Sequence, residues 1–254
     1  TSAVTLWGAC FHGMKQLEEI GDLNTPTGSN LDSMFNGCES LKKMPTIDTT
    51  QALSVREAWK DCRSLTAFPA LILTACTQFE GAWENCVKLE SFPNISVQSA
   101  TQLYKTWANC PELINFPQID TKTITYWHTT FYVHKKATSF PTLNTSNGTY
   151  FYLTWGSMNE LLVMPEFDLK KASYMYRTFF ACTEVDNIAN AGQAYSLPTW
   201  DLSKVTTMIE NFAYMYKIVK FPPMNVSGCS NFRGAWWRCY ALEEFPANMF
   251  NSIP

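Results

Sequence analysis

The sequence predicts an α/β solenoid of ten coils of about 24 residues, each with one short helix and one short strand. Three observations predict it: an aromatic residue that recurs every 24 positions, apolar columns at fixed offsets from that residue, and a recurrent apolar-proline pair. The recurrent aromatic, position 0 of each coil, is Phe11, Phe35, Trp59, Trp83, Trp107, Phe131, Trp155, Phe179, Phe212 and Trp236.

A short amphipathic helix is predicted around each aromatic position. Apolar residues fill the column four residues before position 0 and most of the column three residues after it, and an i, i+4, i+7 spacing forms one stripe of a helix. Clusters such as Asp48-Thr49-Thr50, Asp120-Thr121 and Asp201-Leu202-Ser203 precede it and are suited to cap a helix N-terminus. The column at +3 holds Met14, Cys38, Cys62, Cys86, Cys110, His134, Met158, Cys182, Met215 and Cys239.

A brief extended segment is predicted to follow each helix. Most coils carry an apolar-proline pair at +9 and +10, for example Phe68-Pro69 and Phe92-Pro93, and this stretch is too short and too restricted by proline for a helix. One helix and one strand per coil is a leucine-rich-repeat geometry, in which stacked coils bury one continuous core. At the spacing of paired strands, ten coils make a rod about 50 Å long. We therefore expect residues 1–254 to form a single solenoid domain.

The eighth coil carries an insertion. Leu197-Pro198 fills its apolar-proline position, so the nine extra residues lie at about Ile188 to Ser196. Because the run lacks apolar periodicity, we expect it to form a loop outside the core. Insertions in repeat arrays tend to collect on a binding face, so we expect this loop to take part in recognition or assembly.

The composition excludes several classes of protein. Apolar residues make up 46% of the 254 residues and charged residues only 16%, which is not the composition of a disordered chain. A net charge of −3 and the lack of a basic cluster give no case for nucleic-acid binding. No apolar run reaches the length of a membrane span, so we expect no membrane insertion. The chain starts at Thr1 rather than Met, as a processed product or the ordered part of a longer chain would.

The stretch from Trp200 to Met208, which runs on to Phe212 and Met215, resembles the BspA-like leucine-rich repeats and the related surface-protein repeats of mycoplasmas. The Trp–x–x–Cys–x–x–Leu–x–x–Phe–Pro variant, with the closing residues Phe245 to Phe250, is similar to structural proteins of bacteriophages. This resemblance covers the whole repeat array. It implies a leucine-rich-repeat fold, surface display and adhesion, and it brings no catalytic residues.

The chain has nine cysteines, and those in the +3 column are predicted to be reduced and buried. Six of them share the +3 column with methionine, which can replace a free cysteine in a core but not a disulfide partner. Cys10, Cys76 and Cys229 fall outside this column, and an odd total argues against full pairing. No C-x-x-C pair occurs, so we expect neither a zinc site nor a cofactor.

No motif in the sequence predicts catalysis. The fingerprints of hydrolases, metalloproteases, nucleotide-binding loops and dinucleotide-binding folds are all missing. His134 lies in the +3 column, where a buried histidine is expected. We expect the chain not to be an enzyme. A carbohydrate-active enzyme built on a solenoid is the remaining catalytic alternative, and it would need a carboxylate pair that the sequence does not display.

Tyrosines at the edge of the apolar stripe are the candidate binding residues. Polar residues in coils two to four give way to aromatic residues at −5 and −3 from the fifth coil onward, with His128 in the −3 column. On a helix these two positions lie on opposite sides of the apolar stripe. Such rings are typical of a partner surface or a sugar platform, while a packed rim is the structural alternative. The candidates are Tyr104, Tyr126, Tyr150, Tyr152, Tyr174, Tyr176, Tyr195 and Trp237, whereas the other eight tryptophans fall in core columns.

These observations lead to one expected function with two settings. We expect a non-enzymatic recognition or structural module, displayed on a phage virion as a fibre or adhesin component that binds a host-surface protein, a glycan or a neighbouring virion protein. The alternative is a cellular adhesin repeat domain at the cell surface. Thr1 begins inside a coil, and the last coil stops at Pro254. Other protein chains are therefore expected to cover the ends of the solenoid.

Overall fold

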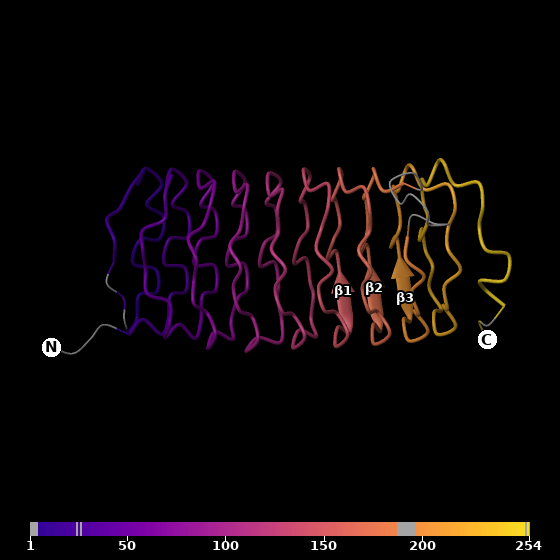
Figure 1. Ribbon diagram of the computed structural model, residues 1–254, viewed down its shortest axis with the longest axis horizontal. Helices are drawn as coiled ribbons and strands as arrows, with labels where there is room; N and C mark the ends of the chain where they lie inside the picture. Colours follow the sequence, from indigo (N-terminus) through magenta and orange to yellow (C-terminus); the bar gives the residue numbers. More distant parts are fainter. Residues whose placement is uncertain (1–4, 24, 26, 187–196, 252, 254) are drawn as a thin grey trace.

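The computed structural model describes residues 5–23, 25, 27–186, 197–251 and 253. Similar coils stand side by side along one long axis, and the two termini lie at opposite ends (Figure 1). Isolated parallel bridges join residues 24 positions apart, such as Asn30 with Ser54 and Ser54 with Gln78. The predicted solenoid is therefore confirmed.

A ladder of backbone hydrogen bonds holds the coils together. The N–H groups at positions −4, −2, 0 and +2 donate to carbonyl oxygens of the next coil, as Trp59 does to Ala82 over 2.9 Å and Asp61 to Glu84 over 2.9 Å. The ladder continues across the insertion, where the N–H of Arg177 donates to the carbonyl of Ile209 over 3.0 Å. The extra residues leave the stacking of coils eight and nine intact. The insertion itself and Tyr195 lie outside the described residues.

Three of the coils carry regular strands on one face. These are β1 (Tyr150–Tyr152), β2 (Tyr174–Tyr176) and β3 (Thr207–Ile209), which pair in parallel in the order β1-β2-β3. The central residue of each strand is buried and its two neighbours are half-buried, because successive side chains of a strand point to opposite faces.

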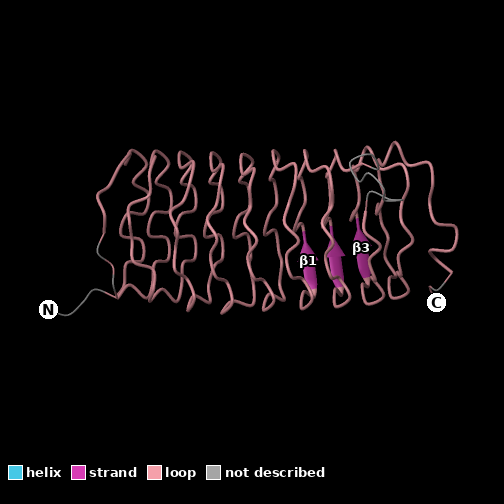
Figure 2. Ribbon diagram, viewed as in Figure 1, coloured by secondary structure: helices cyan, strands magenta, loops and turns pink. Residues whose placement is uncertain are grey.

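The helix prediction is wrong. Turns, strands and isolated bridges occupy the described residues, with no helix among them (Figure 2). Positions −2 and +2 have positive φ in every coil, for example 51° at Glu57 and 58° at Asp61, and an α-helix cannot contain such residues. These left-handed residues turn the chain twice, so that positions −4, 0 and +3 point inward without a helix.

The residues expected to cap helices form turns instead. The carboxylate of Asp48 accepts the backbone N–H of Thr50 over 2.9 Å, and that of Asp201 accepts the N–H of Ser203 over 3.1 Å. These are Asx turns, which satisfy the same side-chain preference as a helix N-cap. The extended segments expected near the Phe-Pro pairs are present as isolated bridges such as Ala67 with Ser91.

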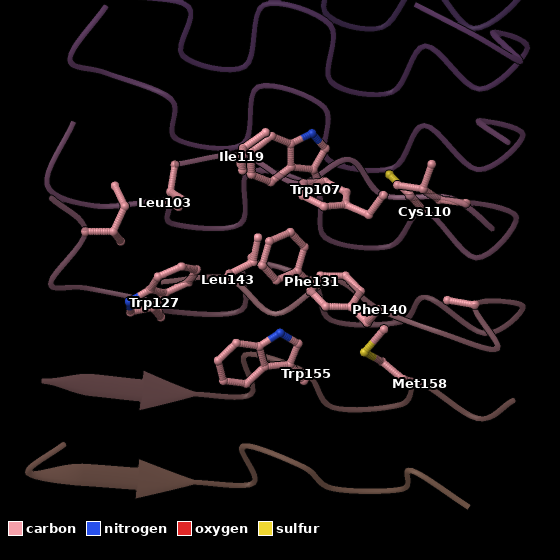
Figure 3. Close-up of a cluster of buried hydrophobic side chains, with 14 of the residues drawn as sticks. Leu103, Trp107, Cys110, Ile119, Trp127, Phe131, Phe140, Leu143, Trp155 and Met158 are labelled. Carbon is pink, nitrogen blue, oxygen red and sulfur yellow. The ribbon is translucent and has the colours of Figure 1, made fainter. Parts of the chain in front are cut away.

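Stacked aromatic rings form the centre of the core. The rings of Trp59, Trp83 and Trp107 are fully buried and stack in sequence with centroids 5.1 and 5.5 Å apart. Phe92 of a Phe-Pro pair meets Trp83 nearly at right angles at 4.7 Å. Figure 3 shows the column continuing from Trp107 through Phe131 to Trp155. The predicted core role is confirmed for six tryptophans, Trp59, Trp83, Trp107, Trp127, Trp155 and Trp200, while Trp7 and Trp236 in the end coils are half-buried.

The +3 column bonds to the backbone of the preceding coil. The thiols of Cys62, Cys86 and Cys110 each donate to the carbonyl at position 0 one coil earlier, over 3.3, 3.2 and 3.2 Å. His134 uses its Nε2 atom in the same way, 2.8 Å from the carbonyl oxygen of Trp107. The predicted burial is confirmed for five of the six column cysteines, and Cys239 in the last coil is half-buried.

Candidate interaction surface

The candidate tyrosines gather on one face of the solenoid. Positions −5 and −3 lie on the same side because the segment is extended, and side chains two residues apart in a strand share a face. The expectation that they flank an inward stripe on opposite sides is therefore wrong. We call this surface the tyrosine panel; it consists of Tyr104, Tyr126, His128, Tyr150, Tyr152, Tyr174 and Tyr176.

The panel consists of two columns of stacked rings. In the first column, Tyr150 stacks on Tyr126 at 4.4 Å and on Tyr174 at 4.7 Å, with planes within 6° of parallel. In the second column, Tyr152 stacks on His128 at 4.5 Å and on Tyr176 at 4.8 Å. Tyr104 extends this column, although its ring is tilted by 45° relative to His128.

Stacking determines which part of each ring faces the solvent. A ring between two parallel neighbours has both π faces covered, so its edge and its polar atom remain accessible. Tyr126 is 36% exposed, and the other rings of the panel are half-buried. The panel therefore presents ring edges and phenol oxygens in regular rows, and it is held rigid by the backbone ladder beneath it.

Three side chains of the panel are uncharged near neutral pH. Burial, followed by repulsion from neighbouring phenolates, raises the pKa of Tyr150 to about 12, and burial also raises the pKa of Tyr174. Burial lowers the pKa of His128, with a smaller contribution from the positive charge of Lys105. Lys105 and Arg177 border the panel, where they pair with Glu84 at 3.4 Å and Glu210 at 2.7 Å.

The same face is polar in coils two to four. Asp32 and Arg56 occupy the −3 column there and form a salt bridge of 2.9 Å, while Asn30 and Ser54 occupy the −5 column. The backbone ladder is the same in both halves. The aromatic side chains are thus not needed to form a coil, and this makes the panel a candidate for a function beyond folding.

Trp237 lies in a second aromatic group, away from the two columns of the panel. Its ring meets Tyr214 at 5.2 Å, and the guanidinium of Arg238 lies 4.7 Å from it. Arg177 connects the two surfaces, because its guanidinium lies 5.4 Å from the Tyr176 ring and 5.0 Å from that of Phe180. We call the second group the arginine-aromatic cluster; it consists of Phe180, Tyr214, Tyr216, Trp237, Arg238 and Tyr240.

Sequence reasoning missed most of this cluster. Tyr216 and Tyr240 stand at +4 in coils nine and ten, and Phe180 and Trp237 stand at +1 in coils eight and ten. Column +4 therefore carried a usable signal, a repeated tyrosine at an exposed position. A helix assigns no common face to +1, +2 and +4, so the predicted helix does not bring these residues together.

The described residues form no candidate metal site. No group of three or more His, Cys, Asp or Glu side chains within that part of the chain is arranged to hold a metal ion. An apolar hollow of about 790 Å³ near Phe221, Met224 and Phe245 includes no residue of the panel. None of the described segments is a helix that could cross a membrane.

The terminal coils expose part of the core. Met14 of the +3 column is 45% exposed at one end, and Phe250 is 43% exposed at the other. Phe250 packs against Phe232 at 5.4 Å, so the turn after the last Phe-Pro pair covers part of that end. Whether other chains cover the ends stays a prediction.

Comparisons with known proteins give only distant likenesses. No protein-family model matches the sequence, and no curated protein sequence matches it either. A leucine-rich repeat protein from Bacteroides ovatus is 16% identical, with a TM-score of 0.49 over 96% of this chain and 79% of that one. A leucine-rich cell surface protein from Faecalibacterium prausnitzii is 14% identical, with a TM-score of 0.32 over 92% of this chain and 85% of that one.

Proposed function

We propose that this chain is a non-enzymatic, surface-displayed recognition module whose tyrosine panel binds a protein partner. One observation carries the proposal: two ordered columns of partly exposed aromatic rings, at −5 in coils six to eight and at −3 in coils five to eight, occupy positions that are polar in coils two to four. Tyrosine is enriched in protein interfaces because its ring provides apolar contact area, its hydroxyl provides a hydrogen bond, and few rotamers are lost on binding.

The orientation of the rings favours a protein over a sugar at the panel. A sugar platform needs an open π face against which the C–H groups of a pyranose can lie. For Tyr150 and Tyr152 both faces are taken up by stacking at 4.4 to 4.8 Å, and the ring edges are exposed instead. A rigid surface of alternating apolar edges and hydroxyls suits a flat protein surface, to which it can donate and from which it can accept hydrogen bonds.

The proposal also includes the setting in which the module is displayed. The Trp–x–x–Cys–x–x–Leu–x–x–Phe–Pro variant supports a fibre or adhesin component of a phage virion, which would bind a host-surface protein or a neighbouring virion protein. The BspA-like stretch from Trp200 to Met208 supports a cellular adhesin. Genes for virion assembly beside the coding sequence would support the first setting, and a lipoprotein signal in the full-length gene would support the second.

Bead adhesion tests the panel directly. Beads coated with the protein are mixed with a collection of intact bacterial strains and, separately, with surfaces carrying immobilised matrix proteins. Strains that bind are tested again after protease shaving and after periodate oxidation of their glycans. We expect adhesion that protease treatment removes and periodate treatment leaves unchanged. The triple variant Tyr126→Ser, Tyr150→Ser, Tyr174→Ser should fold normally and lose at least tenfold in adhesion.

The matched control is the triple variant Asn30→Ala, Ser54→Ala, Gln78→Ala, which changes the same column in coils two to four. It should adhere as well as the wild type. Undiminished adhesion by the well-folded tyrosine variant would move the working surface elsewhere. Adhesion that periodate removes and protease does not would replace the protein partner by a glycan.

A further inference from the structure

Arg238 is held between aromatic rings. Its guanidinium lies 4.7 Å from the ring of Trp237 and 5.2 Å from that of Tyr214, both within the range of a cation–π contact. Tyr214 and Trp237 meet at an angle of 72°, so their rings form a corner that fixes the guanidinium. An arginine that is held by ring faces keeps its in-plane N–H donors available for another group.

No described carboxylate pairs with Arg238. Three other arginines, Arg56, Arg63 and Arg177, each lie within 2.9 Å of an aspartate or glutamate oxygen. The carboxylate of Glu210, which stands at −2 in coil nine, already pairs with the guanidinium of Arg177 at 2.7 Å. The cluster together with Arg177 and Glu210 therefore carries one uncompensated positive charge, and that charge lies on Arg238.

Open aromatic surface lies beside this charge. Trp237 is 49% exposed and Tyr240 is 73% exposed, the highest value among the large apolar side chains of the described residues. Tyr240 stacks on Tyr216 at 5.6 Å with planes 13° apart, which orients its ring. Unlike the inner rings of the panel, these rings combine high exposure with an adjacent unpaired cation.

We propose that the arginine-aromatic cluster is a second binding site, specific for an acidic sugar residue of a polysaccharide. The carboxylate or sulfate of the sugar pairs with Arg238, whose planar fork matches two oxygens of such a group. The C–H groups of the sugar ring lie against the exposed rings of Trp237 and Tyr240, since the face of an aromatic ring is electron-rich. The phenol oxygens of Tyr216 and Tyr240 are available to the sugar hydroxyls.

The side chains of the cluster favour a sugar over an acidic peptide. Coil nine is already paired through its backbone, since the N–H of Tyr214 donates to the carbonyl of Trp237 over 2.8 Å. Coil ten is the last coil, and the N–H of Arg238 has no backbone acceptor among the described residues, so a peptide can add a strand there. The exposed rings of Trp237 and Tyr240 suit the C–H groups of a sugar ring better than an acidic peptide, and the polyglutamate probe tests that alternative.

This site is independent of the tyrosine panel. The panel presents ring edges and is bordered by charges that are already paired, whereas the cluster presents exposed rings and an unpaired charge. The two surfaces meet only at Arg177, which contacts both Tyr176 and Phe180. Loss of one should therefore leave the other intact, and separate experiments can test each of them.

Calorimetric titration with defined oligosaccharides tests the proposal. The probes are tri-galacturonate, a sulfated heparin-type hexasaccharide, a neutral galactose trisaccharide and a polyglutamate peptide, all at low ionic strength. We expect one or both acidic saccharides to bind with a millimolar or lower Kd, and the neutral sugar and the peptide to bind at least tenfold more weakly. Galacturonate and the sulfated probe distinguish a carboxylate from a sulfate ligand. Bound sugar should also change the fluorescence of the exposed Trp237.

Two arginine variants provide the matched comparison. Arg238→Met keeps an apolar stem against the rings and removes the charge, and it should raise the Kd at least tenfold, or about 1.4 kcal/mol. Arg233→Met removes the same charge from an exposed residue of the same coil, outside the cluster, and should change the Kd less than twofold. Both variants should keep the adhesion of the tyrosine panel. Absence of acidic-sugar binding, equal loss in both variants, or equal binding of polyglutamate would overturn the proposal.

Discussion

The Nε2 atom of His134 lies 2.8 Å from the backbone carbonyl oxygen of Trp107, the same contact that the Cys110 thiol makes with Trp83 one coil earlier. His134 is fully buried, and burial lowers its pKa to about 4, well below the ordinary value of 6.5. The imidazole thus replaces a thiol as a neutral donor inside the core, and a proton on its second nitrogen would be a buried charge without a partner.

The stability of the fold should therefore depend on His134 between pH 6.5 and about 4. In this range the unfolded chain binds a proton that the folded chain does not, so the free energy of unfolding falls as the pH falls, by up to about 3 kcal/mol. The variant His134→Cys should lose this contribution. Denaturant melts at pH 7 and pH 4.5 check it, and an unchanged pH dependence in the variant would contradict the buried neutral imidazole.

Trp107 should tolerate phenylalanine and not alanine. Its ring stacks on Trp83 and on Phe131 at 5.5 Å each, so Trp107→Ala removes contacts with both neighbouring coils and should cost about 3–5 kcal/mol. Its indole N–H is buried with no hydrogen-bond partner among the described residues. Trp107→Phe removes that unpaired donor and should cost less than about 1.5 kcal/mol. Equal losses in urea melts would show that ring stacking does not determine the stability of this column.

Val133→Asn should stabilise the solenoid. Val133 has a φ of 66°, an unfavourable conformation for a β-branched residue. Asparagine occupies the same column at Asn85 and Asn109, where the amide of Asn109 donates to that of Asn85 over 2.8 Å. The substitution should relieve strain and extend this row, with a gain of about 1 kcal/mol. Thermal melts measure this gain in stability, and Val133→Ala is the control that lacks an amide. A lower Tm for Val133→Asn than for Val133→Ala would contradict a stabilising role for the amide.

The cysteines should differ sharply in reactivity. Burial raises the pKa of Cys110 and Cys182 to about 12, so their thiols remain protonated and inaccessible in the folded protein. Cys10 is exposed. Alkylation of native protein followed by mass spectrometry should label Cys10 first and Cys239 more slowly. The buried column cysteines should react only after unfolding, and rapid native labelling of Cys86 or Cys110 would contradict the packing of the column.

The sequence alone predicted the period, the core columns and the aromatic columns at −5 and −3. These follow from a simple physical requirement: a coil cannot bury its own apolar side, so the inward residues must recur with the coil, as Trp83, Trp107 and Cys110 do. The same periodicity predicted that His134 is buried. It also predicted that Tyr126, Tyr150 and Tyr174 lie in register, because equal offsets in successive coils stack directly on one another.

Only the tertiary structure decided the path of the chain between those inward positions. An i, i+4, i+7 pattern fits both a helix and a series of turns that pair with the next coil. Hydrogen bonds to the next coil stabilise the turns. Residues such as Glu57 and Asp61 have positive φ in this path. That path brings Tyr150 and Tyr152 onto one face and sets Arg238 between Trp237 and Tyr214. Such contacts depend on pairing between coils, and a residue pattern within one coil does not contain them.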